Sequence, residues 1–334
     1  MGKKDMDIGR DADSSYSYKK PALSAAVVIA GPSSVGLATN ISKTLGSSII
    51  YPELRVFSDG ESKIRIKEEL RNKACIVVQS ASPPQVDRHI LQTLMLLKKC
   101  ADDSAKNIIV VVPYMAYARQ DNAFLEGEVV STELIASLYA IFGARNMVTV
   151  DIHSLRALSY FEERMNSINV SAIPLLADYA KSRLRMNMNN SITVSPDKGG
   201  FSRAKSFALQ LNNKVICMKK RRDRNTGEIN VDYLSSLHKD RIRGQNIALI
   251  DDIVSTGNTI IRTAEIFKAG GCRDIVVMCS HALMTKESTK QIRAAGVEKI
   301  VTTNSVPKLA EVGAFVEVID LSPIIAPAIS KIIS

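Results

Sequence analysis

The stretch at residues 247–259 reads IALIDDIVSTGNT, and it decides the fold of the second half of the chain. Its apolar beginning is typical of a strand that is buried on both faces of a sheet. The strand delivers two adjacent acids, Asp251 and Asp252, to a loop of small residues, after which a helical pattern begins. This order of strand, loop and helix favours a parallel α/β sheet, whose ligands bind at the carboxyl ends of the strands.

The loop after this strand has the composition of a phosphate site. Small side chains allow backbone N–H groups to converge on a phosphate at a helix N-terminus, and hydroxyl groups add further donors. The two carboxylates would be costly without partners, and they suit sugar hydroxyls, which need acceptors. An ordinary turn with a capping Thr is the alternative, whereas a P-loop is excluded because no Gly-Lys-Ser/Thr follows. The loop residues that we predict to bind the ligand are Ser255, Thr256, Gly257, Asn258 and Thr259.

Similar short apolar runs recur along the chain, with helical patterns between them. The helical stretches lie at 86–99, 131–142 and 259–269, where apolar residues share one face. Alternation of strand and helix over the whole length predicts an α/β fold with parallel sheets. The runs that we expect to form strands are 25–31, 74–80, 107–113, 147–153, 191–196, 214–218, 246–252, 274–280, 299–303 and 315–321.

The length of 334 residues exceeds one typical domain. We predict a disordered tail at 1–24, an N-terminal domain at 25–167, a C-terminal domain at 168–322 and a C-terminal helix at 323–334. The similar rhythm of the two halves indicates a duplicated α/β unit. The pattern leaves open which half the last helix packs on.

Composition narrows the class of protein. The net charge of +10 indicates a polyanionic partner, such as a nucleotide, a sugar phosphate or a nucleic acid. Nucleic acid is disfavoured because the chain has no Trp and only 5% aromatic residues, so it lacks a basic surface interleaved with aromatics. The five cysteines form no C-x-x-C pair, which favours reduced thiols over disulfides or zinc. Without a targeting segment or a membrane span, we expect a cytoplasmic protein.

Polar residues at other predicted strand ends carry further chemistry. Phe57 precedes Asp59, Gly60 and Glu61, a set that can stack on a base and accept its amine protons; alone, it reads more readily as a surface turn. Arg119 offers a fork of donors for phosphate oxygens, and Gln120 can bond a base or a ribose; a helix N-terminus with a surface Arg is the alternative.

Two further segments at strand ends and one basic run also contain candidate functional residues. His153 follows a strand two residues after an acid, and Asp197 ends a strand in the other half. A lone His at such a place is more often structural than a ligand. The run from Lys219 to Arg222 precedes a polar loop, and by itself it reads as a solvated surface.

Taken together, these motifs resemble the ribose-phosphate pyrophosphokinase family over roughly residues 25–330, on the phosphoribosyltransferase fold. The 247–259 stretch is similar to the phosphoribosyl-pyrophosphate motif shared with type I phosphoribosyltransferases. The other motifs resemble the pyrophosphokinases alone. The resemblance implies two tandem Rossmann-like parallel-sheet domains and the reaction of ATP with ribose 5-phosphate to give AMP and 5-phosphoribosyl 1-pyrophosphate.

The resemblance also implies a role for each motif. ATP is expected on Arg119, Gln120 and the segment from Phe57 to Glu61, the latter from a neighbouring subunit of a homo-oligomer, at least a dimer. Ribose 5-phosphate is expected on Asp251, Asp252, residues 255–259 and Arg222. Mg²⁺ is expected at His153 and Asp197, an ion that needs few protein ligands beside substrate phosphates. Lys220 and Arg222 fall on the catalytic pair of a mobile loop.

The sequence departs from the family pattern at a few positions. Ser255 stands where many members have Asp, and Asn258 where Gly or Ala is usual. Asn122 replaces a frequent basic residue, and the residues after it lack the usual basic cluster, which puts phosphate and nucleotide regulation in question. A phosphoribosyltransferase and a catalytically silent regulatory subunit are the alternatives to an active pyrophosphokinase.

Overall fold

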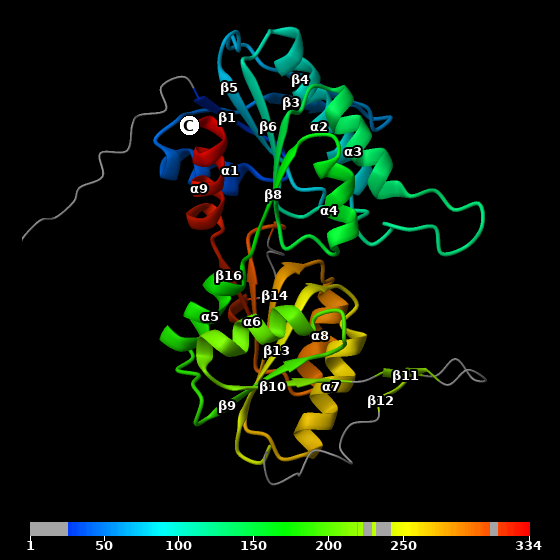
Figure 1. Cartoon of the computed structure of the whole chain (residues 1–334), viewed down its shortest axis with the longest axis vertical. Coiled ribbons are helices and arrows are strands. Elements are labelled where there is room, and N and C mark those ends of the chain that lie inside the picture. The colour runs from blue at the N-terminus through cyan, green and yellow to red at the C-terminus, as the bar shows by residue number, and fades with distance from the viewer. Residues whose placement is uncertain (1–25, 219, 223–228, 232–241, 308–312) are drawn as a thin grey trace, which may run out of the picture.

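The computed structural model describes residues 26–218, 220–222, 229–231, 242–307 and 313–334. It contains two parallel six-stranded sheets, one in each half of the chain (Figure 1). The predicted α/β class with two parallel-sheet domains is confirmed. The predicted tail at 1–24 lies outside the described residues.

The N-terminal sheet has the strand order β2-β1-β5-β6-β7-β8. The C-terminal sheet has the order β10-β9-β13-β14-β15-β16, so each sheet places its second strand at one edge and then runs in sequence order. This identical topology supports a duplicated unit. The strands are β1 (Ala26–Ala30), β2 (Ser48–Ile50), β5 (Ala74–Val78), β6 (Asn107–Val112), β7 (Asn146–Val150), β8 (Asn166–Val170), β9 (Ser191–Ser195), β10 (Lys214–Cys217), β13 (Asn246–Val254), β14 (Ile275–Ala282), β15 (Lys299–Thr303) and β16 (Val316–Ile319).

Helices cover both faces of each sheet, as buried parallel sheets require. In the N-terminal domain, α2 (Val86–Asp102), α3 (Ser131–Ile141) and α4 (Leu155–Glu162) pack on one face, and α1 (Val35–Leu45) packs on the other. In the C-terminal domain, α6 (Phe201–Leu211) covers one face, and α7 (Asn258–Ala269) and α8 (Lys286–Ala294) cover the other. A 3₁₀ turn at Gly313–Phe315 precedes β16.

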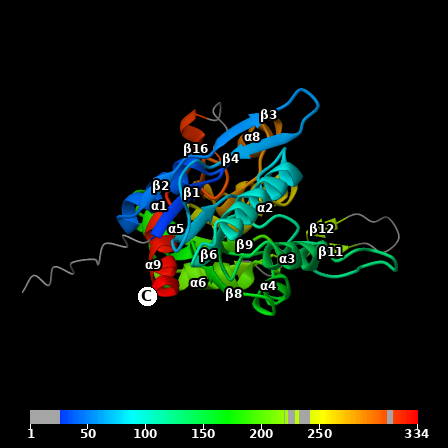
Figure 2. The same cartoon turned by 90° about the horizontal axis from the view of Figure 1, so that it is seen from above.

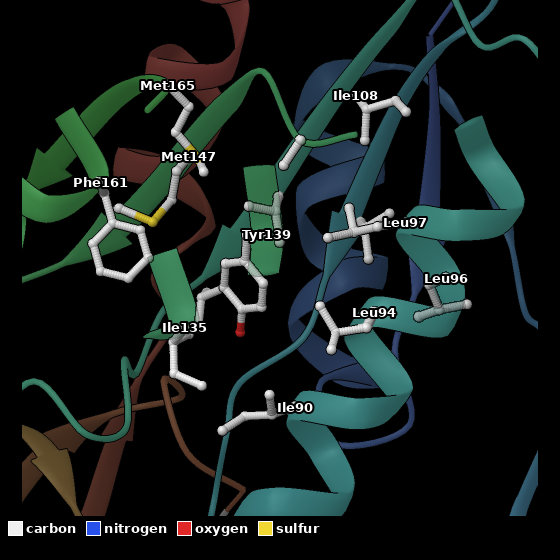
Figure 3. Packing of buried hydrophobic residues seen from close by; sticks show 14 of the residues in the cluster. Ile90, Leu94, Leu96, Leu97, Ile108, Ile135, Tyr139, Met147, Phe161 and Met165 are labelled. Carbon is white, nitrogen blue, oxygen red and sulfur yellow. The ribbon is translucent and has the colours of Figure 1, made fainter. Parts of the chain in front are cut away.

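The core under α2, α3 and α4 shows why these segments fold as they do. Ile90, Leu94 and Leu97 recur at helical spacing on α2 and point toward the sheet (Figure 3). Tyr139 of α3 and Phe161 of α4 are fully buried, with ring centroids 6.3 Å apart. Burying each side chain of this size contributes roughly 1.5–3 kcal/mol, and these contacts fix α4, whose first residues border the site described below.

The helix that follows the last strand of each sheet packs on the other domain. Helix α5 (Ile173–Ser182) follows β8, yet its apolar face packs with α6 in the C-terminal core. Helix α9 (Ser322–Ile333) follows β16 and packs beside α1 on the N-terminal sheet (Figure 1). The exchange of these two helices ties the domains together, and it answers the question of where the C-terminal helix packs.

The structure shows several strands that the apolar pattern did not reveal. Strand β8 spans the predicted division between residues 167 and 168, so the N-terminal sheet continues to Val170. As an edge strand it carries Asn166 and Asn169 and lacks a continuous apolar run. Two short ribbons were also missed: β3 (Glu53–Val56) with β4 (Ser62–Arg65), and β11 (Lys220–Arg222) with β12 (Ile229–Val231). Short β2 was missed as well.

All five cysteines are free thiols, and four of them are buried. Among the described residues, no helix combines the length and the apolar character that a membrane span requires.

Candidate active site

A cleft of about 940 Å³ lies between the two domains, where the carboxyl ends of strands from both sheets face each other. Its walls come from the ends of β7 and β13, from the first residues of α4 and α6, and from the loop that precedes α7. This is the place at which open α/β sheets bind ligands. Of the predicted site residues, it is lined by Arg119, His153, Asp197, Asp251, Asp252, Ser255, Thr256, Gly257, Asn258 and Thr259.

The turn between β13 and α7 forms one wall of the cleft. Gly257 has φ 78°, in the left-handed region that favours glycine, and it precedes the first residue of α7. A Cβ at this position would lie 2.6 Å from two side-chain atoms of Ile292 on α8. Thr256 and Asn258 are exposed to the cleft. The turn therefore presents small polar side chains and the N–H groups of a helix N-terminus, which together suit a phosphate.

Asp252 holds the two domains together at the back of the cleft. Its carboxylate accepts a hydrogen bond from His153 Nδ1 at 2.7 Å, across 99 residues of sequence. Arg203 Nη2 lies 3.6 Å from the same oxygen and donates to the carbonyl groups of Ile152 and His153 at 3.1 and 3.2 Å. Asp252, expected on sugar hydroxyls, is therefore already engaged with a histidine and an arginine.

The two adjacent acids differ in their tendency to ionise. Burial raises the pKa of Asp251 to about 8, helped by the hydrogen bond to Asp252 and by the negative charges of Asp252 and Asp197. Burial opposes the ionisation of Asp252 as well. There, however, the hydrogen bond from His153 and the charge of Arg203 prevail, and they hold its pKa well below the usual range. Asp252 is thus the anion of the pair, and Asp251 can keep a proton near neutral pH.

The donor set of the cleft fits a magnesium ion that keeps most of its water. Because ionised Asp252 can only accept, His153 Nδ1 carries the proton, and Nε2 is the ring atom that can face a cation. Asp197 Oδ1 accepts from Gly200 N at 3.1 Å, at the start of α6. Within the described part of the chain, no group of three His, Cys, Asp or Glu side chains could hold an ion alone. Two protein ligands beside substrate phosphates are the arrangement that Mg²⁺ accepts.

The nucleotide side of the predicted site is only partly gathered in the cleft. Arg119 lines it, whereas the Gln120 side chain donates to Asn122 O at 3.2 Å and to Glu128 Oε2 at 3.3 Å. The same Glu128 oxygen accepts from the backbone of Phe124 and Leu125. Glu128 therefore folds the loop between β6 and α3 on itself and holds Gln120 away from the cleft.

The segment from Phe57 to Glu61 forms the tip of the β3–β4 ribbon and does not line the cleft among the described residues of its own chain. Figure 2 shows this ribbon extending outward from the N-terminal domain. Phe57 N donates to Glu61 O at 2.9 Å, and Glu61 N donates to Asp59 Oδ1 at 3.1 Å. Gly60 closes the turn with φ 96°. The Arg55 guanidinium lies 4.7 Å from the ring centre of Phe57.

The predicted catalytic pair, Lys220 and Arg222, lies at the edge of what the structure describes. Their backbone forms β11, which pairs with β12. Their side chains, and residues 223–228 beyond them, lie outside the described residues. The ribbon follows β10, whose neighbour β9 ends beside Asp197.

Arg203 and Asn169 are two of the cleft residues that were not predicted from the sequence. Arg203 lies six residues after Asp197 on α6, and only the basic charge so near a strand-end acid could have drawn attention to it. Asn169 belongs to the overlooked edge strand β8, where its side-chain oxygen accepts from Ile152 N at 3.0 Å. Both residues shape the backbone that carries His153.

Comparison with known families agrees with this geometry. Residues 26–143 match the N-terminal domain of ribose phosphate pyrophosphokinase. Residues 170–311 match the phosphoribosyl transferase domain. These two matches cover most strands of both sheets, and they leave out residues 144–169, which include β7 and His153.

Individual relatives extend the match to nearly the whole chain. The chain is 35% identical over 300 residues to a ribose-phosphate pyrophosphokinase of Sulfurisphaera tokodaii, covering 90% of this chain and 99% of that protein. It is 30% identical over 306 residues to the enzyme of Aquifex aeolicus, covering 91% and 95%. A phosphoribosylpyrophosphate synthetase structure from Mycobacterium smegmatis shares the fold, with a TM-score of 0.81, 24% identity and coverage of 92% and 98%. The chain therefore belongs to the ribose-phosphate pyrophosphokinase family.

Proposed function

We propose that this protein transfers the pyrophosphoryl group of ATP to ribose 5-phosphate, giving AMP and 5-phosphoribosyl 1-pyrophosphate. The observation that carries the proposal is the cleft itself. It sets a phosphate-type turn at residues 255–259 in one domain against Arg119 and His153 in the other. A reaction between a sugar phosphate and a nucleotide needs two such half-sites that face each other.

The sugar phosphate belongs on the C-terminal side. Its phosphate group would accept from the N–H groups and hydroxyls of the turn, and the carboxyl groups of Asp251 and Asp252 lie at the end of the same strand. A partly protonated Asp251 could both donate to and accept from a ring hydroxyl. Asp252 acts chiefly by holding His153 and Arg203 in place, through the contacts described above.

The nucleotide belongs on the N-terminal side. Arg119 would bind phosphate oxygens through its fork of donors. The anomeric oxygen of the sugar then attacks the β-phosphorus in line, and AMP leaves. Negative charge builds up on the phosphoryl oxygens, so pre-placed cations lower the barrier. We assign this task to Lys220 and Arg222, with Arg222 also reaching the sugar phosphate.

His153 and Asp197 would hold Mg²⁺, which neutralises phosphate oxygens and thereby supports transfer. The hydrogen bond from His153 Nδ1 to Asp252 fixes the ring so that Nε2 is directed away from the carboxylate. Closure of the β11–β12 segment over the cleft would exclude water and limit the hydrolysis of ATP.

The base-binding residues are expected to come from a second copy of the chain. The tip of the β3–β4 ribbon, with Phe57, Asp59, Gly60 and Glu61, does not line the cleft of the described chain. An exposed aromatic ring next to two acids is suited to bind the adenine of an ATP molecule that lies in the cleft of a neighbouring chain. We therefore propose a homo-oligomer of at least two chains that acts in the cytoplasm. Gln120 would bind the base only after its hydrogen bond to Glu128 is broken.

A direct assay tests the proposal. Purified protein with Mg²⁺, ATP and ribose 5-phosphate should form equal amounts of AMP and 5-phosphoribosyl 1-pyrophosphate. Omission of the sugar phosphate or chelation of Mg²⁺ should abolish both products. Formation of a nucleotide from a free base, without formation of AMP in its absence, would identify a phosphoribosyltransferase instead. Binding of both substrates without turnover would identify a silent regulatory subunit.

A further inference from the structure

Behind the cleft, a second set of polar side chains joins the two domains. His281 and Ser280, in strand β14 of the C-terminal domain, face Val150 and Asp151 at the end of β7 in the N-terminal domain. His281 Nε2 lies 3.0 Å from Val150 O, and the Ser280 hydroxyl donates to the Asp151 carboxylate. We call His281, Ser280, Ser305 and Asp151 the seam. All four residues are buried.

The hydrogen bonds of the seam are specific in direction. The Val150 carbonyl can only accept, so His281 Nε2 carries the proton. Burial lowers the pKa of His281, which keeps the ring neutral, and its Nδ1 lies 2.8 Å from the Ser305 hydroxyl, whose single proton can go to this nitrogen or to Ser280 O at 2.9 Å. These polar side chains fix one relative position of the domains, because a small displacement leaves buried groups unpaired.

The seam contacts two segments of the N-terminal domain that line the cleft, which are the loop with Arg119 and the end of β7 before His153. The first contact is made through Tyr114. Tyr114, which begins the loop that carries Arg119, has its ring 5.2 Å from the ring of His281. The backbone N–H of Tyr114 donates to Ser80 Oγ at 3.2 Å, and the Ser80 hydroxyl donates to Ser305 O. The loop with Arg119 therefore rests on the C-terminal domain through Tyr114 and Ser80.

The other branch of the seam leads to His153. Asp151 has φ 38°, a left-handed conformation that is strained for a residue with a side chain. Its carboxylate accepts from Ser280 and from Ala172 N at 2.9 Å, and its own N–H donates to Val170 O. The backbone that carries His153 is thus held in an unfavourable conformation partly by a side chain of the opposite domain.

We propose that His281, supported by Ser280, is a positioning residue that sets the distance between the nucleotide half-site and the sugar-phosphate half-site. The inference rests on the proposed function, because it assigns the two substrates to different domains. The phosphate-type turn lies wholly in the C-terminal domain and Arg119 in the N-terminal domain, so the seam contributes little to these contacts with either substrate. It contributes to transfer, in which a displacement of about 1 Å between reacting groups costs up to a hundredfold in rate.

The test uses His281→Phe, which keeps a ring but removes both nitrogen atoms, and His281→Gln, whose amide can still donate to Val150 O. Steady-state rates are measured with Mg²⁺, ATP and ribose 5-phosphate, and calorimetry gives the Kd of ribose 5-phosphate alone. We expect His281→Phe to lower kcat by tenfold to a hundredfold, with both KM values and the Kd within about twofold of the wild type. His281→Gln should recover most of the rate. Ser280→Ala should give a smaller loss of the same kind.

A matched control separates positioning from loss of stability. Thr193 is a buried residue whose hydroxyl bonds Asn213 within the C-terminal domain. Thr193→Val should lower Tm without lowering kcat. An equal loss of kcat in Thr193→Val, a raised KM with unchanged kcat in His281→Phe, or no recovery in His281→Gln would each overturn the proposal.

A readout that does not depend on turnover separates this inference from the proposed function. Amide hydrogen exchange at residues 151–154 should accelerate in His281→Phe, while exchange at residues 256–260 stays at the wild-type rate. If His281→Phe accelerates exchange at residues 151–154 but the wild type forms no AMP, the proposed function is refuted and the inference about the seam stands. An active wild type whose 151–154 exchange is unaffected by His281→Phe would refute the seam.

Discussion

The two domains have the same strand order but handle their ligands differently. In the C-terminal domain, one continuous segment from β13 to α7 supplies the two acids and the phosphate-type turn. In the N-terminal domain, the predicted ligand residues are scattered: Arg119 lines the cleft, Gln120 bonds Glu128, and Phe57 lies on an outward ribbon. In our proposal, one copy of the duplicated unit has a site that is complete within its own domain, and the other has a site that depends on motion and on a neighbouring chain.

We infer that the sugar phosphate binds to a rigid site, whereas the affinity of the nucleotide site can be modulated. A turn built on a strand and a helix is rigid and needs little reorganisation to bind a sugar phosphate. A nucleotide site assembled from a loop, a ribbon and a second chain costs free energy to order, and that free energy can be modulated. The following predictions test this contrast from the largest expected effect to the smallest.

The largest effect is expected at Lys220, which lies on β11, outside the rigid turn at residues 255–259. Lys220→Ala should lower kcat by at least about a hundredfold, as does the loss of other donors that stabilise a transition state. The KM for ribose 5-phosphate should change little, because the turn that binds it is intact. Initial-rate measurements of AMP formation check this, and near-normal turnover would contradict the assignment.

A smaller effect is expected when the rigid turn itself is strained. Gly257→Ala places a Cβ in a left-handed conformation and 2.6 Å from side-chain atoms of the buried Ile292, so the turn or this side chain must shift. Strain of this kind costs about 1–3 kcal/mol. If about 1.4 kcal/mol of it is lost from binding, the KM for ribose 5-phosphate rises about tenfold. The KM for ATP should stay nearly constant.

Gly244→Ala is the matched control for this variant. Gly244 also has a positive φ, of 72°, but a Cβ there meets nothing within 4 Å. It should lower stability without changing either KM. Equal changes in KM for the two variants would mean that the turn does not bind the sugar phosphate.

The fold was largely readable from the sequence because most strands are buried on both faces. Ile109, Val110 and Val111 leave no alternative to a strand between two layers of helices. Edge strands such as β8 escaped, because one side of an edge strand faces solvent and tolerates polar residues. The turn at 255–259 was predictable because all its small and hydroxyl residues lie in one short segment, directly after a strand.

The rest of the site could not be read in this way, because it depends on contacts between distant segments. Nothing near His281 in the sequence indicates Val150, which lies 131 residues away. The engagement of Asp252 by His153 across 99 residues adds a contact with the other domain to a residue that is predicted to bind the sugar. Domain packing, and not local pattern, created these pairs.

A moderate effect is expected at the outward ribbon. If Phe57 of one chain binds the base in the cleft of another, Phe57→Ala should raise the KM for ATP several-fold, and activity per chain should fall on dilution. In a mixed oligomer, the cleft of a Phe57→Ala chain keeps its Lys220 and can receive the intact ribbon of a Lys220→Ala chain. Co-refolded equal amounts should recover about a quarter of wild-type activity at ATP below its KM, the value for random pairing into dimers. Mixed activity no higher than the average of the separate variants would place Phe57 in its own cleft.

The smallest effect concerns the unequal acids in the rigid wall. The pKa of Asp251 is raised to about 8 by burial and by its carboxylate neighbours. Between about pH 4 and pH 8 the folded protein keeps a proton that the unfolded chain has lost, so this stabilisation is full at low pH and disappears as the pH rises through about 8. Asn cannot ionise. The Tm of Asp251→Asn minus that of the wild type should therefore increase by a few degrees between about pH 5.5 and pH 8.5.

This measurement is made by thermal denaturation in the presence of a chelator, without ligands. Asp252 does not disturb it, because a lowered pKa affects stability only when the pH falls below the usual range of an aspartate. Asp178→Asn is the control, since 72% of the Asp178 side chain is exposed, and its Tm difference should stay constant. A constant difference for Asp251→Asn as well would show that the acid ionises normally. The rigid wall would then present two negative charges to the sugar instead of one anion beside a proton donor.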